Sequence, residues 1–155
     1  MGIVVFDLDQ TIIDSRHRTP VKDGKVDVVK YISLQTRDNI YRDTILPLAD
    51  VMKKDYKDNY IIICTARHMT KNDYDFLRDN DLKYHEIYER GIVDKSISSL
   101  DDAEYKMKCL KKYKHINYTF YDDSEEVINK FKMYPNVRMV DSKIENVNLL
   151  QIEAQ

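Results

Sequence analysis

Hydrophobic and polar positions are arranged along this chain in blocks. Short apolar runs rich in β-branched and aromatic side chains lie at residues 3–6, 60–64, 84–88, 118–121 and 137–140. Continuous apolar runs of this length are typical of strands that are buried on both faces of a sheet. The pattern therefore predicts the strands of a central parallel sheet.

The segments between these runs carry apolar residues at helical spacing. Their apolar positions are Leu48, Val51, Met52 and Tyr56; Tyr74 and Leu77; Ala103, Met107 and Leu110, with Lys114 on the same face; and Val127, Ile128 and Phe131. The sequence from Thr70 to Asp73 resembles a capping box, and Ser124 is placed to cap the last helix. Strands that alternate with helices pair in parallel through right-handed crossovers. We therefore predict an α/β fold, a three-layer Rossmann-like sandwich with a five-stranded parallel sheet, as a single domain over residues 1–155.

Only residues 14–43 resist this assignment. The segment is polar, and its apolar residues fit neither a helix nor a strand clearly; they are Val26, Val28, Val29, Tyr31 and Ile32. We expect this segment to form at most a small lid.

The composition is that of a soluble globular protein. Of the 155 residues, 43% are hydrophobic and 34% are charged, and the net charge is −2. No apolar run approaches the ~20 residues that span a bilayer, and the first residues lack the basic region of a signal peptide. The two cysteines, Cys64 and Cys109, lie in apolar contexts without metal-ligand spacing. These features predict a cytoplasmic protein without membrane contact.

Polar and charged residues collect where the apolar runs end. They are Asp7 and Asp9 after the first run, Thr65 and Arg67 after the second, and Asp122 and Asp123 after the fourth. Ligands of parallel α/β sheets bind at the carboxyl ends of the strands, so these side chains are expected to converge. The acids would repel one another unless a cation joined them, and hard oxygen ligands suit Mg²⁺.

Each residue taken singly has an ordinary structural explanation. An Asp-x-Asp after a strand is commonly a turn or a helix cap, and Lys106 stands among other lysines, including Lys108. Helical phase places Lys106 with Ala103 and Leu110, whereas Lys108 falls on a charged side of the helix. Lys106 is therefore expected to enter the site, with Lys108 as the alternative.

This combination resembles the haloacid dehalogenase (HAD) superfamily of phosphotransferases. The signature Asp-x-Asp-x-Thr matches residues 7–11, the second-strand hydroxyl matches Thr65, the lysine matches Lys106, and the acidic pair matches Asp122 and Asp123. One departure is Gln10, where many members have glycine. The second aspartate of the signature, Asp9, separates phosphatases from dehalogenases.

A narrower likeness is to the phosphatase half of bacteriophage polynucleotide kinase–phosphatase. Its additional functional residues match Arg18, Arg67, Arg90 and Asp102 in this sequence. The P-loop of the kinase half has no counterpart in the sequence, which implies a free-standing phosphatase domain. If the likeness is functional, these residues and Thr11 bind the substrate.

The resemblance also implies a mechanism. Asp7 would be the nucleophile that becomes a phospho-aspartate, and Asp9 the general acid and base. Mg²⁺ would be held by Asp7, the main-chain carbonyl of Asp9 and Asp122, with Asp123 bound directly or through water. Thr65 and Lys106 would contact the phosphoryl group.

The expected substrate is a phosphomonoester, a nucleic-acid end or a nucleotide. The stretch between Thr65 and Lys106 is too short for a large cap domain, and an open site admits a polymer end. The leading hypothesis is a Mg²⁺-dependent polynucleotide 3′-phosphatase, and the alternative is a 5′(3′)-nucleotidase or another small-molecule phosphatase. An uncapped protein phosphatase and a non-catalytic receiver-like module are weaker alternatives, and the oligomeric state stays open.

Overall fold

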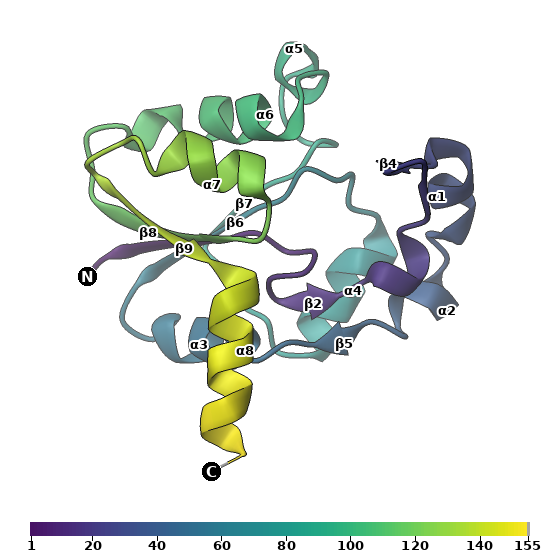
Figure 1. Cartoon of the computed structure of the whole chain (residues 1–155), viewed down its shortest axis with the longest axis horizontal. Coiled ribbons are helices and arrows are strands. Elements are labelled where there is room, and N and C mark those ends of the chain that lie inside the picture. The colour runs from purple at the N-terminus through teal and green to yellow at the C-terminus, as the bar shows by residue number, and fades with distance from the viewer. Residues whose placement is uncertain (155) are drawn as a thin grey trace.

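A five-stranded parallel sheet lies at the centre of the computed structural model, which describes residues 1–154 (Figure 1). The strands across the sheet are β7 (Glu86–Tyr88), β6 (Tyr60–Cys64), β1 (Ile3–Phe6), β8 (Tyr118–Asp122) and β9 (Val137–Asp141). The chain starts in the middle strand, builds one side with β6 and β7, and then builds the other side with β8 and β9. The strand order thus reverses beside β1, which is where α/β sheets bind their ligands.

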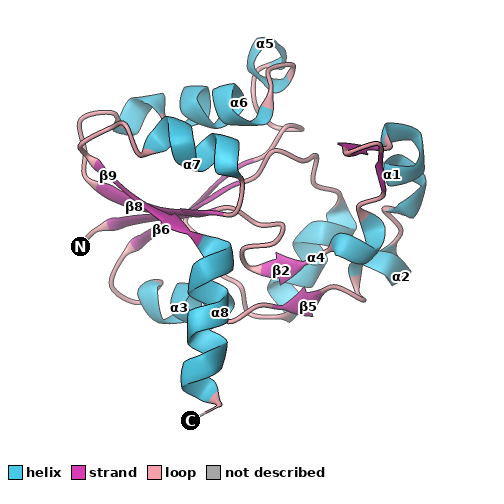
Figure 2. Ribbon diagram, in the orientation of Figure 1, coloured by secondary structure: helices cyan, strands magenta, loops and turns pink. Residues whose placement is uncertain are grey.

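Helices cover both faces of the sheet, as Figure 2 shows. Side chains of α3 (Leu48–Asp55) and α4 (Lys71–Asp79) join one core with Val4 and Phe6 of β1. Side chains of α6 (Asp102–Cys109) and α7 (Glu125–Phe131) join a second core with Val5. Consecutive residues of β1 therefore enter opposite cores, as expected for a strand buried on both faces. The predicted three-layer α/β fold is confirmed.

Two predicted helix caps are present. Thr70 and Asp73 form a capping box at the start of α4, and the Ser124 side chain accepts the N–H of Val127 at the start of α7. The third strand differs from its prediction, because β7 begins at Glu86 and not at residue 84. The N–H of Ile61 donates to the imidazole Nδ1 of His85 at 2.9 Å. The ladder with β6 starts at the next residue, where Glu86 pairs with Ile62.

The C-terminal helix α8 (Ser142–Glu153) has no counterpart among the predicted helices. Its buried residues are polar, Ser142 and Asn146, while apolar residues such as Ile144 are exposed. Asn146 accepts the N–H of Leu48 at 2.9 Å and donates to the carbonyl of Thr11 at 3.0 Å. Docking through an amide side chain leaves no apolar periodicity to detect.

Residues 14–43 form a small subdomain, called the lid below, at one end of the sheet. It contains a 3₁₀ turn (Arg16–Arg18), the hairpin of β3 (Val21–Lys22) and β4 (Lys25–Val26), α1 (Val28–Leu34) and α2 (Arg37–Ile40). The ladder between β2 (Ile13–Asp14) and β5 (Thr44–Ile45) closes its base (Figure 1). The remaining elements are α5 (Lys95–Ser98) and a second 3₁₀ turn (Lys111–Tyr113).

A buried ion pair joins the beginning of the lid to its end. Arg18, which is 1% exposed, donates from Nε and Nη2 to the two carboxylate oxygens of Asp43 at 2.8 and 2.6 Å. Its Nη1 also contacts Gln35, whose amide donates to the Arg18 carbonyl at 2.9 Å. These bonds hold α1 in a defined position over the domain.

None of the helices described in residues 1–154 is long and apolar enough to cross a membrane.

Candidate active site

The predicted catalytic residues meet at the carboxyl ends of the three central strands. Asp7 follows β1, Thr65 follows β6, and Asp122 ends β8. They line a cleft of about 960 Å³ that also receives Lys106 from α6 and side chains of the lid. The cleft is where the reversal of strand order predicts a ligand.

Asp7 and Lys106 form the buried floor of the cleft. The Lys106 ammonium donates to Asp7 Oδ1 at 2.9 Å and to Asp122 Oδ2 at 2.7 Å. Lys106 is 3% exposed, whereas Lys108 is exposed to solvent. The structure therefore places Lys106, and not the alternative Lys108, beside the predicted nucleophile.

Three carboxylates of the floor fit a divalent cation. Asp7, Asp122 and Asp123 each offer an oxygen, and these oxygens lie within 4.8 Å of one another. Asp122 Oδ1 accepts the Ser124 N–H at 2.9 Å, which fixes its orientation at the start of α7. An all-oxygen donor set with room for water suits Mg²⁺. The side chain of Asp9 is not part of this group, in line with the main-chain role expected for that residue.

The electrostatics of the floor also favour a bound cation. Burial and the neighbouring Asp122 raise the pKa of Asp7 well above its usual value, although Lys106 opposes this. Burial likewise raises the pKa of Asp123. Burial lowers the pKa of Lys106, but Asp7 and Asp122 raise it more, so the lysine stays charged. One lysine does not balance the clustered carboxylates, and a dication would restore the ionised form of Asp7.

Asp9 lies at the edge of the cleft with one oxygen held and one facing an arginine. Ser15 Oγ donates to Asp9 Oδ1 at 2.7 Å, and Arg67 Nε lies 3.3 Å from Asp9 Oδ2. The Nε of Arg67 is buried and makes no hydrogen bond within the described residues. Asp9 is partly exposed, so it is accessible to a substrate oxygen.

The loop after β1 is tightly wound. The carbonyl of Leu8 accepts the N–H groups of Thr11, Ile12 and Ile13 at 3.0–3.3 Å. Gln10 takes a φ of +62°, a left-handed conformation that glycine adopts more easily. This explains why glycine is common at that position of the signature and why Gln10 marks a strained point of the loop.

The structure separates two predicted substrate-binding residues from the cleft. Arg18 does not line it, because its guanidinium is buried against Asp43 inside the lid. Thr11 is fully buried, and its hydroxyl lies 2.7 Å from Ser142 Oγ and 3.5 Å from Asp7 Oδ2. Both residues thus support the site from behind, and the expectation that they touch the substrate is corrected.

Arg67, Arg90 and Asp102 do line the cleft, together with Thr65. Arg90 donates to Asp102 at 2.8 Å and to the carbonyl of Leu100 at 2.8 Å, so most of its donors are engaged within the chain. Arg67 also pairs with the buried Asp73 at 3.1 Å. Arg67 thus lies between Asp73 and the predicted general acid Asp9.

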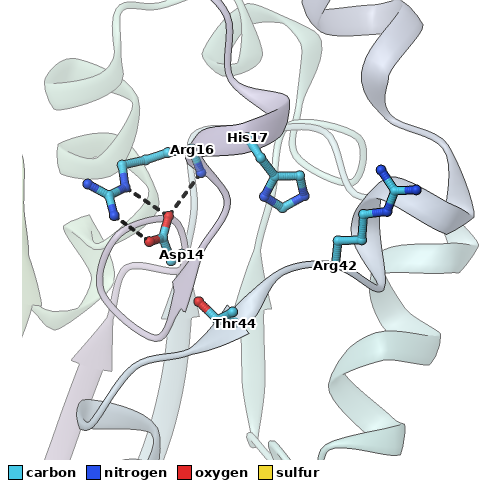
Figure 3. Close-up of a pocket in the computed structure, with 5 residues that line it drawn as sticks. All are labelled: Asp14, Arg16, His17, Arg42 and Thr44. Carbon is cyan, nitrogen blue, oxygen red and sulfur yellow. Dashed lines mark hydrogen bonds and ion pairs between the residues drawn. The ribbon is translucent and has the colours of Figure 1, made fainter.

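A second hollow, of about 500 Å³, lies at the base of the lid (Figure 3). It is lined by Asp14, Arg16, His17, Arg42 and Thr44. The Arg16 guanidinium turns toward Asp14 and donates to its two carboxylate oxygens at 3.0 and 2.7 Å. None of the predicted catalytic groups reaches this hollow, so the chemistry belongs to the cleft at Asp7.

Sequence patterns did not reveal the residues that orient the catalytic groups. Ser15 holds Asp9, Asp73 faces Arg67, and the lid presents Val28, Tyr31 and Ile32 to the cleft. Ser15 and the lid residues lie in the segment without periodicity, and Asp73 was interpreted only as a helix cap. A carboxylate in a capping box that is 3% exposed can serve both purposes.

Comparison with known proteins gives a family and a fold. The family described as bacteriophage T5 5′-deoxynucleotidase matches residues 1–155. The 5′-deoxynucleotidase of Escherichia phage T5 is 31% identical over an alignment of 156 positions. The alignment covers 85% of this chain and 64% of that protein. The chain therefore spans less than two thirds of the length of this relative.

Solved structures share the fold at low identity. A chain of the Pnkp1/Rnl/Hen1 RNA repair complex matches with a TM-score of 0.66 and 17% identity, over 90% of this chain and 41% of that one. A haloacid dehalogenase-like hydrolase from Streptococcus pneumoniae matches with a TM-score of 0.62 and 12% identity, over 99% and 97%. A HAD-superfamily hydrolase from Geobacter sulfurreducens matches with a TM-score of 0.59 and 12% identity, over 96% and 99%. These matches confirm the predicted haloacid dehalogenase-like fold.

Proposed function

The chain belongs to the bacteriophage T5 5′-deoxynucleotidase family, and from this membership and the site geometry we propose that it is a Mg²⁺-dependent phosphatase of deoxynucleoside 5′-monophosphates. The observation that carries the proposal is the buried cluster of Asp7, Lys106 and Asp122 at the floor of a cleft. A carboxylate held beside an ammonium and two further acids is the arrangement that aspartyl-phosphate chemistry requires.

In the proposed reaction, a carboxylate oxygen of Asp7 attacks the phosphorus of the monoester. The bond to the leaving oxygen breaks, and Asp9 protonates that oxygen to release the nucleoside. Asp9 then takes a proton from water, whose oxygen attacks the phospho-aspartate and regenerates Asp7. Throughout, Lys106 places a positive charge against the carboxylate and the phosphoryl oxygens. Mg²⁺ bound by Asp7, Asp122 and Asp123 would supply neutralisation of the phosphoryl charge.

The environment of Asp9 suits this double role. Its hydrogen bond from Ser15 fixes one oxygen, while its other oxygen faces the cleft and Arg67. Thr65, which is buried at the end of β6, lies where a hydroxyl would meet a phosphoryl oxygen. A general acid needs this combination of a fixed carboxyl group and access to the leaving oxygen.

The polynucleotide 3′-phosphatase is the second candidate. It is favoured by Arg90 and Asp102, which lie at the wall of the cleft. It is disfavoured by the burial of Arg18 and by the bonds that already occupy Arg90, because neither arginine is then available to bind a nucleic-acid backbone. A mononucleotide needs no such row.

A substrate panel tests the proposal. We expect kcat/KM to be highest for deoxynucleoside 5′-monophosphates, lower for nucleoside 3′-monophosphates and lowest for a 3′-phosphorylated oligonucleotide. Asp7→Asn should abolish turnover, and Lys106→Ala should reduce it severely, whereas Lys108→Ala on the same helix is the matched control and should not. A 3′-phosphorylated oligonucleotide that is hydrolysed faster than every mononucleotide would transfer the proposal to the second candidate.

Thermal unfolding tests the metal site without relying on turnover. Mg²⁺ should raise the Tm of the wild-type chain, because a ligand that binds only the folded state stabilises it. Asp122→Asn should remove most of that increase, whereas Asp102→Asn, outside the carboxylate group, should keep it. An equal increase in all three proteins would show that the ion does not bind at Asp7, Asp122 and Asp123.

A further inference from the structure

The helix α1 of the lid is rich in apolar residues but buries none of them fully. Val28 is 63% exposed and Ile32 is 68% exposed, although both are large apolar side chains. Exposed apolar residues that lie side by side commonly mark a surface that binds a partner or a ligand. On this helix they need an explanation, because the domain does not use them for folding.

These side chains face the catalytic cleft. Val28, Tyr31, Ile32 and Gln35 all line the same cavity as Asp7, and their spacing of three or four residues puts them on one side of the helix. Val29 is 81% exposed and does not line the cleft, so it lies on another side. The cleft thus has a charged floor on the sheet and an apolar wall on the lid.

The apolar wall is held in place before any ligand binds. The amide of Gln35 donates to the carbonyls of Tyr31 and Arg18 at 2.8 and 2.9 Å. Arg18 in turn is fixed by Asp43 at the other end of the lid. Such preorganisation reduces the conformational entropy that a ligand would otherwise have to remove.

Tyr31 is half-buried and lines the same cleft as Asp7, Asp9 and Arg67. Its ring is therefore the aromatic contribution of the lid to the wall that faces the predicted catalytic residues. A ring in this position is next to the leaving group of a phosphomonoester whose phosphorus is at Asp7. The leaving group of the proposed substrate is a deoxynucleoside, which carries a flat base with an apolar aromatic face.

We propose that Val28, Tyr31 and Ile32 form the nucleobase-binding surface of this enzyme, with the base against the lid and the 5′-phosphate at Asp7. The inference rests on the proposed function and adds the specificity determinant to it. Contact with aromatic and aliphatic side chains accepts every base, because each base has a π-face. The enzyme should therefore accept purine and pyrimidine deoxynucleotides alike and bind poorly to phosphate esters without a base.

The test compares substrates that differ only in the base. Deoxynucleoside 5′-monophosphates and deoxyribose 5-phosphate share the sugar and the phosphate. Tyr31→Ala should raise KM for the nucleotides about tenfold or more, the range found when a stacking side chain is removed, with a smaller change in kcat. The same substitution should leave kcat/KM for deoxyribose 5-phosphate within about twofold of wild type.

Matched variants separate binding from folding. Ile32→Ala should act like Tyr31→Ala but more weakly, Tyr31→Phe should retain the wild-type KM, and Val29→Ala on the outer side of the helix should change neither substrate. Equal losses on nucleotide and sugar phosphate, or no loss on the nucleotide, would overturn the base-binding surface. A wild-type chain that hydrolyses no deoxynucleotide would instead overturn the proposed function itself, and this inference with it.

Discussion

At the scale of single residues, Lys106 sets the charge of the site before a ligand binds. It contacts two carboxylates of the floor at 2.7 and 2.9 Å from a buried position on α6. Neighbouring lysines of the same stretch, such as Lys108 and Lys111, are exposed. The function of Lys106 therefore comes from its depth in the fold, since the surrounding sequence is rich in the same residue type.

If Asp9 is the general acid, as proposed, the effect of its loss on the turnover rate should depend on the leaving group of the substrate. Asp9→Asn should slow turnover of a deoxynucleotide roughly 10²–10⁴-fold, because an alkoxide needs a proton to leave. Turnover of para-nitrophenyl phosphate should fall much less in its phosphorylation step, because that phenolate leaves without a proton. Stopped-flow measurement of the first turnover with both substrates checks this. Equal losses would assign Asp9 a role in binding and not in proton transfer.

The residues that could be predicted are those whose place follows from the topology. Asp7, Thr65 and Asp122 directly follow or end parallel strands, and strand ends converge wherever such a sheet forms. Arg18 could not be placed in this way. Its burial depends on Asp43 and Gln35, which come from a segment without periodicity, and nothing in the local sequence distinguishes a buried arginine from one that binds a ligand.

At the scale of elements, the lid depends on polar contacts more than on a core of its own. The β2–β5 ladder pairs only Ile13 with Ile45 and Asp14 with Thr44. The buried bidentate pair of Arg18 and Asp43 lies just inside this short ladder. A charged group without its partner in such a place is strongly destabilising.

This pair predicts that alanine substitution of Arg18 destabilises the fold much more than alanine substitution of the neighbouring Arg16. Arg18→Ala should lower the free energy of unfolding by about 3–5 kcal/mol, because it leaves the buried Asp43 without its bidentate partner and with only His17 Nε2 at 3.5 Å. Arg16→Ala removes a pair with Asp14 in which the arginine side chain is 79% exposed, and should change the free energy of unfolding far less, because solvent screens the pair. Urea unfolding followed by circular dichroism measures both variants.

A double variant tests whether the uncompensated charge of Asp43 causes the loss of stability. The double variant Arg18→Met with Asp43→Leu should recover much of the stability lost in Arg18→Ala, because it removes both charges together. Similar stabilities of Arg16→Ala and Arg18→Ala would contradict the structural role of the buried pair.

Helices with an apolar face and a cap could be predicted, and the others could not. α4 and α7 begin directly after their predicted caps, Thr70 and Ser124. α1 could not be predicted because its apolar residues face the cleft and not a core. α8 could not be predicted because its buried contact with α3 is made by the amide of Asn146. In both helices the usual link between periodicity and burial is absent.

At the scale of the whole molecule, the acid stability of the fold has an identifiable contributor at the sheet edge. Glu86 of β7 receives hydrogen bonds from the hydroxyls of Tyr60 and Tyr113 at 2.8 and 2.6 Å, and it pairs with Lys112 at 2.7 Å. Burial alone would raise the pKa of Glu86, but these donors, with Lys112 first, lower it to about 2.

The sign of this shift predicts the pH range in which it acts. A carboxyl group with a lowered pKa in the folded state stabilises the fold above its unfolded pKa, about 4.5, and this contribution is lost as the pH falls toward about 2. Asp7 and Asp123, whose pKa values are raised, contribute with the opposite sign in metal-free solution. Glu86→Gln should therefore flatten the acid side of the curve of unfolding free energy against pH. Parallel curves for the variant and the wild type between pH 4.5 and 2 would exclude Glu86 as the cause.

The central position of β1 also has a consequence for how the molecule is made. Ile3 of β1 pairs with Tyr60 on one side and with Tyr118 on the other. Within the sheet, β1 is therefore synthesised well before the two strands with which it pairs. Such distant pairings slow folding and leave an apolar strand with open edges in the meantime. Because Asp7 directly follows this strand and Asp122 ends one of its partners, the proposed nucleophile Asp7 gains its surroundings only when nearly the entire sheet has formed. Enzymatic activity should consequently be among the last properties to appear when the protein folds.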